Sequence, residues 1–424
     1  MKPGLDKAEL NHSIRPQDDL FRHVNGLWLE STAIPEDQAV YGSFMILRDD
    51  SELAVKEVLE DAAANPRPGV AQQIGDLYAS FLDEDRIEKL GAQPMQDGLS
   101  RISNISDRKD LFNLLGAFER EGLPGIWGSY VDNDAGNPER YLVHMYQGGI
   151  GLPDKDYYTD EKYEDIRTEY VPHISRMLML AGWSATDAID AAQAIYELEA
   201  KIAQHHWSRV ESREAEKTYN LKDLAGLKSL NKKILWDEYL AGAELKSSLL
   251  DWNVVMMPSF FEGIEDLLAD EHLETWKLWL SWVLVRSYAP YLSSGFIEER
   301  FAFYGTKLTG QPVNRPRWKR AVSLVEGSLG EAVGQIYVEK HFPPAAKTRM
   351  VELVANLIEA YRIDIAALSW MTSETKSKAF EKLDKFTPKI GYPDKWRDYS
   401  ALEITRDDLI GNLARVTKFN QDYE

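Results

Sequence analysis

Residues 368–399 have the sequence LSWMTSETKSKAFEKLDKFTPKIGYPDKWRDY. The stretch begins as a helix with clear ends, because Thr372 or Ser373 can cap its N-terminus and no proline follows before Pro388. Apolar side chains recur inside it at helical spacing, and lysines occupy most of the remaining surface. These apolar residues are Ala379, Phe380, Leu383 and Phe386. The pattern predicts an amphipathic helix followed by an ordered, turn-rich loop.

Two other segments have helical periodicity that predicts a buried face. Residues 273–291 carry three tryptophans spaced by three, and such a stripe is typical of a core-facing helix. Residues 346–368 predict a long helix with an apolar stripe that we expect to be buried. Its members are Met350, Leu353, Val354, Leu357, Tyr361, Ile365 and Leu368.

Three glycines recur in a further helical segment that precedes Pro343. Gly327, Gly330 and Gly334 lie on one side of that helix, and each glycine costs roughly 1 kcal/mol relative to alanine. Their spacing therefore predicts a close crossing with another helix.

Composition places the protein among folded, water-soluble chains. The 424 residues are 44% hydrophobic and 11% aromatic, enough for a sizeable core. A formal net charge of −20 argues against nucleic acid or an anionic membrane as a partner. There is no cysteine, which excludes disulfides and thiolate chemistry and favours a reducing compartment. The first 21 residues do not resemble a signal peptide, and no apolar stretch is long enough to span a bilayer. We therefore expect a cytoplasmic location.

Several short blocks link the chain to a known family. They are P-x-D-D-x-F from Pro16, N-G-x-W from Asn25, G-S-F-x-x-L-R from Gly42, Q-G-G-x-G-L-P from Gln147, T-K-x-K-A-x-x-K-L from Thr375 and K-I-G-Y-P from Lys389. With these blocks the sequence resembles the neprilysin-type zinc metallopeptidases, in particular the bacterial oligopeptidase branch. Extracellular relatives carry a disulfide-forming cysteine where this chain has Gln17, a difference that agrees with a reducing compartment.

The zinc motif of such enzymes, H-E-x-x-H on a helix, does not occur in the 424 residues. No two of the eight histidines are four positions apart, and adjacent His205 and His206 point in different directions on a helix. Motifs for a serine nucleophile or a phosphate loop are also missing from the sequence. The sequence thus predicts no catalytic residue and no metal ligand in this chain.

Other polar features have simpler interpretations. The glycines of residues 148–151 are followed by Pro153 where a nucleotide loop requires a helix. The acidic doublets at 18–19, 49–50 and 407–408 suit helix starts better than acid–base catalysis. The basic run 315–320 contains Trp318 and could suggest nucleic-acid binding. In so acidic a chain, an ion-pairing surface is the better interpretation.

The resemblance identifies two candidate substrate-binding residues. In the family, the phenylalanine of G-x-F-x-x-L-R lines the apolar pocket just past the scissile bond, and the arginine binds the C-terminal side of the peptide. These positions match Phe44 and Arg48. Many relatives carry another arginine where this chain has Val40. The alternative is that Phe44 belongs to the core and that Arg48 pairs with neighbouring carboxylates.

We expect a mainly α fold: a large multi-helix lobe with few short strands, plus incomplete pieces of a thermolysin-like catalytic lobe. The resemblance implies that residues 1–50 contribute to the catalytic lobe, that 51–388 form the helical lobe enclosing the substrate cavity, and that 389–424 re-enter the catalytic lobe. The helix and loop of 368–399 then mark the boundary between the lobes.

The chain is expected to be the N-terminal region of a zinc metalloendopeptidase or oligopeptidase that cleaves peptides between two lobes. Zinc would belong to the parent enzyme, with none bound to this chain. The expected partners are peptide substrates and a C-terminal catalytic segment. Two alternatives remain open: a non-catalytic helical binding or scaffold protein derived from the peptidase lobe, and one subunit of a split peptidase.

Overall fold

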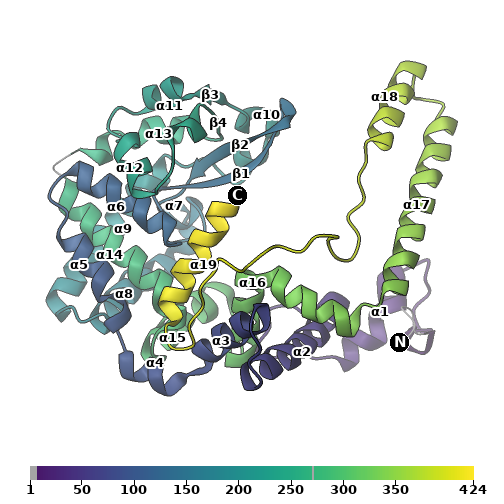
Figure 1. The fold of residues 1–424 in the computed structure, drawn as a ribbon, viewed down its shortest axis with the longest axis horizontal. Helices are drawn as coiled ribbons and strands as arrows, with labels where there is room; N and C mark the ends of the chain where they lie inside the picture. The colour runs from purple at the N-terminus through teal and green to yellow at the C-terminus, as the bar shows by residue number, and fades with distance from the viewer. Residues whose placement is uncertain (1–6, 270–271) are drawn as a thin grey trace.

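A computed structural model describes residues 7–269 and 272–424 of the chain (Figure 1). In the first half the helices are α1 (Leu20–Ser31), α2 (Ser43–Ala64), α3 (Val70–Leu82), α4 (Glu84–Leu90), α5 (Gln96–Ser103), α6 (Arg108–Arg120), α7 (Asp156–Thr159), α8 (Glu164–Leu180) and α9 (Ala185–Gln204). In the second half they are α10 (Ala215–Thr218), α11 (Leu224–Leu230), α12 (Trp236–Gly242), α13 (Pro258–Gly263), α14 (Leu273–Tyr288), α15 (Ser294–Arg300), α16 (Arg317–His341), α17 (Pro344–Ala367), α18 (Ser373–Asp384) and α19 (Leu409–Tyr423). The predicted mainly α fold is confirmed. Among the described residues, no helix combines the length and apolar character needed to cross a bilayer.

Four short strands form a mixed sheet at one end of the helical body. They are β1 (Trp127–Asp134), β2 (Asn137–Gln147), β3 (Leu221–Asp223) and β4 (Trp252–Val255), in the order β1-β2-β4-β3. The β1–β2 pair is an antiparallel hairpin in which Trp127 lies opposite Gln147, and β2 runs parallel to β4. Strand β2 ends at Gln147, so the glycine-rich loop at 148–151 follows it directly.

The tryptophan stripe of α14 lies in the larger of two hydrophobic cores. Trp276, Trp279 and Trp282 are at most 1% exposed, so the predicted core face is confirmed. Burial of an indole requires a partner for its N–H group. The three indoles donate to Leu267 O, Gly149 O and Tyr170 Oη at 2.7, 3.1 and 3.1 Å.

The loop after β2 packs onto a buried carboxylate. Glu199 Oε2 accepts hydrogen bonds from the hydroxyls of Tyr158 and Tyr170 at 2.8 and 2.9 Å. Burial raises the pKa of Glu199, and the nearby Arg286 partly opposes that rise. Tyr158 Oη in turn accepts from the N–H groups of Gly151 and Leu152, each at 3.1 Å. The glycine-rich loop is therefore fixed by buried polar contacts within the fold.

His206 supports the same loop from the end of α9. Its Nε2 lies 2.8 Å from Gly148 O, and its ring packs edge-on against Phe260. Burial lowers the pKa of His206 to about 4. Its neighbour His205 contacts a different part of the chain, near Gly263.

A second core joins segments that are distant in the sequence. It contains residues of α2, α3 and α16 together with Tyr399, Leu402, Leu409 and Val416 near the C-terminus. Gln73 Nε2 donates to the backbone oxygens of Tyr399 and Leu402 at 2.8 and 2.6 Å. In contrast, Ile390, Tyr392 and Trp396 are only partly buried. The expected lobe boundaries at 50 and 388 remain predictions.

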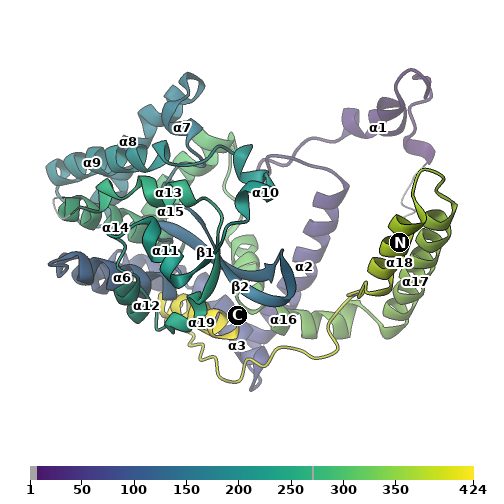
Figure 2. The same ribbon diagram turned by 90° about the horizontal axis from the view of Figure 1, so that it is seen from above.

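Helices α17 and α18 form a hairpin that projects from the body in both views (Figure 1, Figure 2). Thr372 caps α18 by accepting a hydrogen bond from Thr375 N–H at 3.2 Å, as the sequence predicts. Neither helix contains a buried residue, so the expected buried stripe of α17 is wrong. Its most exposed members are Met350, Leu353, Leu357 and Tyr361. Periodicity reveals an apolar face but not whether another part of the chain covers it.

The glycine prediction is also wrong in its location. A Cβ added at Gly327 or Gly330 would meet no atom within 4 Å, so no helix crosses α16 there. The close crossing joins α6 and α12 instead, where a Cβ on Gly116 would lie 2.0 Å from Tyr239 O. A Cβ on Gly242 would lie 1.8 Å from Asn113 O. In α1, Gly26 lies inside the helix and packs against Asn11.

We predict that Gly116→Ala destabilises the protein by at least about 2 kcal/mol, because the added methyl group forces two helix backbones apart. Gly327→Ala is the matched control, since its methyl group enters open space and gains up to about 1 kcal/mol of helix propensity. Urea unfolding followed by tryptophan fluorescence measures both. Equal stability of the two variants would contradict the crossing.

We predict that His206 makes unfolding pH-dependent. Its folded-state pKa of about 4 lies below the unfolded value, so its stabilisation is complete above pH 6.5 and is lost as the pH falls towards 4. His206→Gln keeps a donor for Gly148 O but does not titrate. Between pH 7 and 4.5, the free energy of unfolding of this variant should fall by about 2 kcal/mol less than that of the unchanged protein. His341 is exposed, so the control variant His341→Gln should show the same fall in the free energy of unfolding as the unchanged protein.

Candidate functional site

The start of α2 exposes the first candidate residue. The helix begins at Ser43 directly after Gly42, and Phe44 lies in its first turn. The Phe44 side chain is 82% exposed, and Leu47 one turn later is 61% exposed. The alternative that Phe44 belongs to the core is therefore wrong. An apolar side chain this exposed is available to a ligand or to another protein surface.

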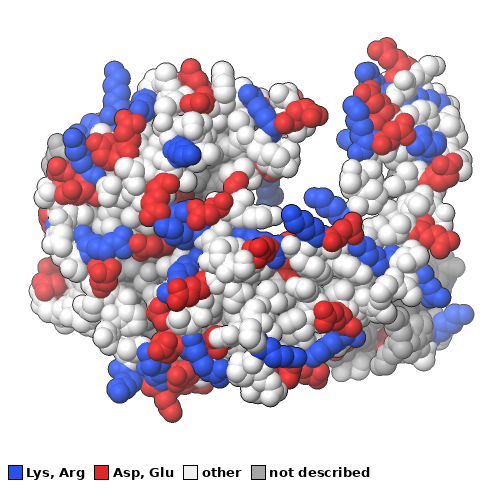
Figure 3. All heavy atoms as spheres, viewed as in Figure 1, with Lys and Arg blue, Asp and Glu red and all other residues white. Residues whose placement is uncertain are grey.

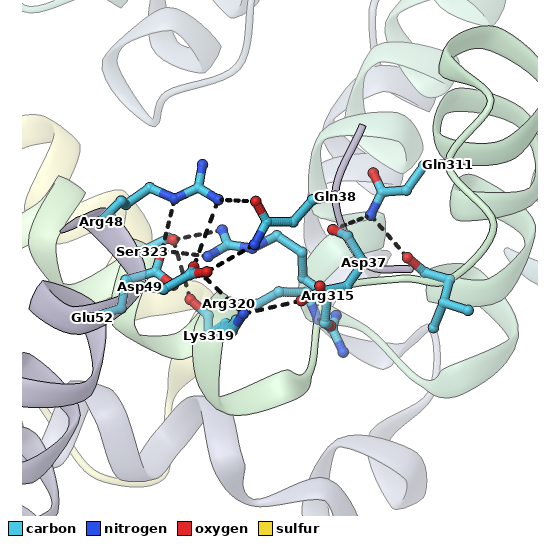
Figure 4. A network of polar contacts seen from close by, with 11 residues as sticks. Asp37, Gln38, Arg48, Asp49, Glu52, Gln311, Arg315, Lys319, Arg320 and Ser323 are labelled. Atoms are coloured by element: carbon cyan, nitrogen blue, oxygen red, sulfur yellow. Dashed lines mark hydrogen bonds and ion pairs between the residues drawn. The ribbon is translucent and has the colours of Figure 1, made fainter. Parts of the chain in front are cut away.

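Arg48 lies in the next turn and is held by polar contacts (Figure 4). Its Nη2 donates to Gln38 Oε1 at 3.2 Å, and the guanidinium lies within 4 Å of the carboxylates of Asp49 and Glu52. The pairing proposed as the alternative for Arg48 thus exists. The Arg48 side chain nevertheless remains 43% exposed, which leaves part of the guanidinium accessible.

The basic run at residues 315–320 provides the cations that face this segment. Lys319 Nζ lies 3.1 Å from Asp37 Oδ2 and 3.7 Å from Asp49 Oδ1. Arg315 pairs with Glu52 and also donates to Ser323 Oγ at 3.1 Å. Arg317 donates to Phe81 O on the opposite side of the run. The ion-pairing interpretation of this run is confirmed.

A fourth carboxylate lies close to this network. Besides Asp37, Asp49 and Glu52, Glu326 interacts electrostatically with the network and lies one helical turn beyond Ser323 in α16. Burial raises the pKa of Glu326, and the negative charge of Glu52 raises it further. The cations that form ion pairs with Asp37, Asp49 and Glu52 are Arg48, Arg315 and Lys319. Each cation therefore contributes to holding mutually repelling carboxylates together.

The molecule is hollowed between the α17–α18 hairpin and the body, as Figure 3 shows. An open cavity of about 930 Å³ lies between α17 and the loop after α18. Val351, Ala355 and Ile358 line one side, and residues 387–394 line the other. Lys347 fixes the loop by donating to Tyr392 O at 2.9 Å and by pairing with Asp394 at 3.0 Å. The cavity combines apolar side chains with an extended backbone.

The described residues do not fit a zinc ion. They contain no group of three or more histidine, cysteine, aspartate or glutamate side chains placed to hold a metal. His206 is engaged with Gly148 O, and His173 Nδ1 lies 2.7 Å from Glu299 Oε1 inside the core. No catalytic step through a metal can therefore be assigned to this part of the chain.

The acidic doublets have structural roles. Asp19 caps α1 by accepting from Arg22 N–H at 2.8 Å, and Asp408 caps α19 by accepting from Gly411 N–H at 3.0 Å. Asp49 differs, because it lies in the second turn of α2 and joins the contacts of Lys319. A helix-start role for the doublet at 49–50 is therefore wrong.

The structure brings Arg48 together with residues that the sequence did not identify as part of the site. Asp37 and Gln38 come from the loop before α2, and Lys319 comes from α16. The basic run was a visible signal for Lys319, but its partners lie more than 200 residues away in the sequence. Whether Phe44 and Arg48 bind substrate remains a prediction.

Known proteins resemble the chain over most of its length. Neprilysin-3 of Drosophila melanogaster is 26% identical over 96% of this chain and 55% of its own length. Neprilysin of Mus musculus is 26% identical over 97% and 60%. The chain thus spans little more than half of these curated relatives.

Solved structures agree with the fold. The zinc metalloprotease Zmp1 of Mycobacterium tuberculosis, in complex with an inhibitor, superposes with a TM-score of 0.93 at 44% identity. That match covers 99% of this chain and 64% of the Zmp1 chain. PepO of Lactobacillus rhamnosis, at 22% identity and a TM-score of 0.85, shares the fold. The sequence model of Peptidase family M13 matches residues 16–393. Because this match covers most of the chain, the protein belongs to peptidase family M13.

Proposed function

We propose that the chain is the N-terminal, non-catalytic part of a zinc metalloendopeptidase or oligopeptidase that hydrolyses peptides between two lobes. The observation that carries the proposal is the family match over residues 16–393 in a sequence without H-E-x-x-H. In the proposed parent enzyme, a further segment supplies the zinc site. A cytoplasmic location is part of the same proposal and rests on the cysteine-free sequence.

The uncovered apolar face of α17 supports this proposal. Leu353, Leu357 and Tyr361 are 50%, 52% and 63% exposed along one side of the helix. Large exposed apolar patches are typical of interfaces. A catalytic segment packed against this face would shield it and would close the hollow beside α17. The split-peptidase alternative uses the same face, with the segment supplied by a separate chain.

Phe44 and Arg48 are the proposed peptide contacts. Phe44 offers an exposed apolar side chain for a substrate side chain, and Arg48 offers a partly accessible guanidinium for the C-terminal side of the peptide. A guanidinium forms strong, directional hydrogen bonds with carboxylates. The two residues lie four positions apart in α2 and thus on the same side of the helix.

We predict that the purified 424-residue chain binds no stoichiometric zinc and does not cleave a quenched fluorescent peptide, even with zinc added. The physical reason is the lack of a ligand set in the described residues. Elemental analysis and a fluorescence assay provide the measurements. Bound zinc together with metal-dependent turnover would contradict the proposal.

We predict that Phe44→Ala weakens binding of a fluorescein-labelled apolar peptide with a free carboxyl end by roughly tenfold, as measured by anisotropy. This magnitude corresponds to the loss of about 1.5 kcal/mol of apolar contact, the lower end of the range for burial of an apolar side chain. Arg48→Met should weaken binding of the same peptide severalfold. It should have a smaller effect on binding of the same peptide with an amidated C-terminus. The control variants are Tyr141→Ala and Arg67→Met, which remove similarly exposed side chains elsewhere on the protein. Both should bind the peptide with normal affinity. Unchanged affinity in both site variants would refute the assignment.

A further inference from the structure

Residues 7–54 are attached to the rest of the protein without buried hydrophobic side chains. The buried residues in this range are Asn11, Gly26, Gln38 and Glu52. Among the residues that the structure describes, Val55 is the first along the chain with a buried hydrophobic side chain. Burial of apolar surface normally supplies most of the adhesion between segments of a protein. The position of this segment therefore depends on its polar contacts with the body.

Lys319 makes the central polar contact (Figure 4). Its ammonium group lies between Asp37 and Asp49, so it links the loop before α2 to the second turn of α2. The side chains of Lys319, Asp37 and Asp49 are only 15%, 16% and 24% exposed. Ion pairs that are shielded in this way are screened less by salt than pairs at the surface.

Gln38 extends this link to Arg48. Its Nε2 donates to Asp49 Oδ2 at 2.9 Å, and its Oε1 accepts from Arg48 Nη2 at 3.2 Å. One buried amide thus holds the guanidinium and the carboxylate together. Arg315, just before α16, pairs with Glu52 one turn after Arg48. Gln311 adds a hydrogen bond of 3.0 Å to Asp37 O.

We propose that Lys319 and Arg315 are positioning residues, which attach the loop at 37–42 and the start of α2 to the helical body and thereby orient Phe44 and Arg48 towards a bound peptide. This inference rests on the proposed function, since it takes Phe44 and Arg48 as the peptide contacts. Without Lys319, Asp37 loses the ion pair that holds it, and Asp49 keeps only the longer pair with Arg48. The loop then loosens, and Arg48 loses the arrangement that orients it.

Hydrogen exchange of the full chain tests the attachment. In Lys319→Met, the amide of Gln38, which donates to Pro35 O at 2.9 Å, should exchange about five- to tenfold faster. The first turn of α2 should behave in the same way, while α14 keeps its protection. Lys319→Arg should restore slow exchange. Lys228→Met removes the same charge from an exposed pair with Asp237 and should have no effect. Unchanged exchange in Lys319→Met would overturn the inference.

Peptide affinity tests whether Lys319 acts through Arg48. With the labelled free-carboxyl peptide, Lys319→Met should bind about three- to tenfold more weakly. In the double variant with Arg48→Met, the loss should be clearly smaller than the product of the two single losses, because both changes disable one contact. Independent, multiplying losses would overturn the inference.

The two proposals fail in different measurements. An Arg48→Met variant with normal affinity contradicts the peptide contact of Arg48. A Lys319→Met variant with normal exchange contradicts the positioning role, whatever the result for Arg48→Met. If Lys319→Arg has normal peptide affinity and normal exchange while Lys319→Met has weaker affinity and faster exchange, the positive charge at position 319 positions the segment. That result argues against a general loss of stability as the cause.

Discussion

Helix α16 connects the parts of the molecule through two different kinds of contact. Its apolar side, which includes Ala321, Val322 and Val325, is buried in the core shared with α2, α3 and the C-terminal segment. The other side carries Lys319, which reaches the N-terminal segment through ion pairs. Leu329 departs from helical geometry, with φ −132° and ψ 37°, and the helix bends there before it leads into α17. The orientation of α16 thus fixes both the body and the segments attached to it.

Local pattern in the sequence was sufficient where the chain itself supplies the packing partner. The stripe of Trp276, Trp279 and Trp282 is buried as predicted, because α9 packs against α14 and other segments of the chain accept the three indole hydrogen bonds. The same periodicity failed in α17, whose stripe faces solvent. Glycine spacing did not predict the position of a close helix crossing, for a related reason. A helix crossing requires a second helix at the right place, and only the fold reveals that Gly116 has one and Gly327 does not.

The candidate site was predictable only in part. Family motifs identified Phe44 and Arg48, and charge composition identified the run at 315–320 as an ion-pairing surface. The partner of Lys319 was not predictable, because Asp37 lies 282 positions earlier and many acidic residues were equally plausible. Gln38 gave no signal at all, since a single amide between charged residues is ordinary on a surface. Its burial becomes apparent only when α2 packs beside α16.

The exposed stripe of α17 places a physical constraint on any account of this chain. At 24 residues, α17 is long enough for helical propensity to support it, and Arg362 connects it to α18 through Asp384. A free-standing hairpin needs only polar side chains on its outer faces, so apolar Leu353 and Leu357 add nothing to its own stability. They contribute only when another surface removes them from water. The cavity beside α17 is lined by a different face of the helix, with Val351, Ala355 and Ile358, and by the loop at 387–394. On the proposed function, the surface that removes Leu353 and Leu357 from water is the catalytic segment of the parent peptidase.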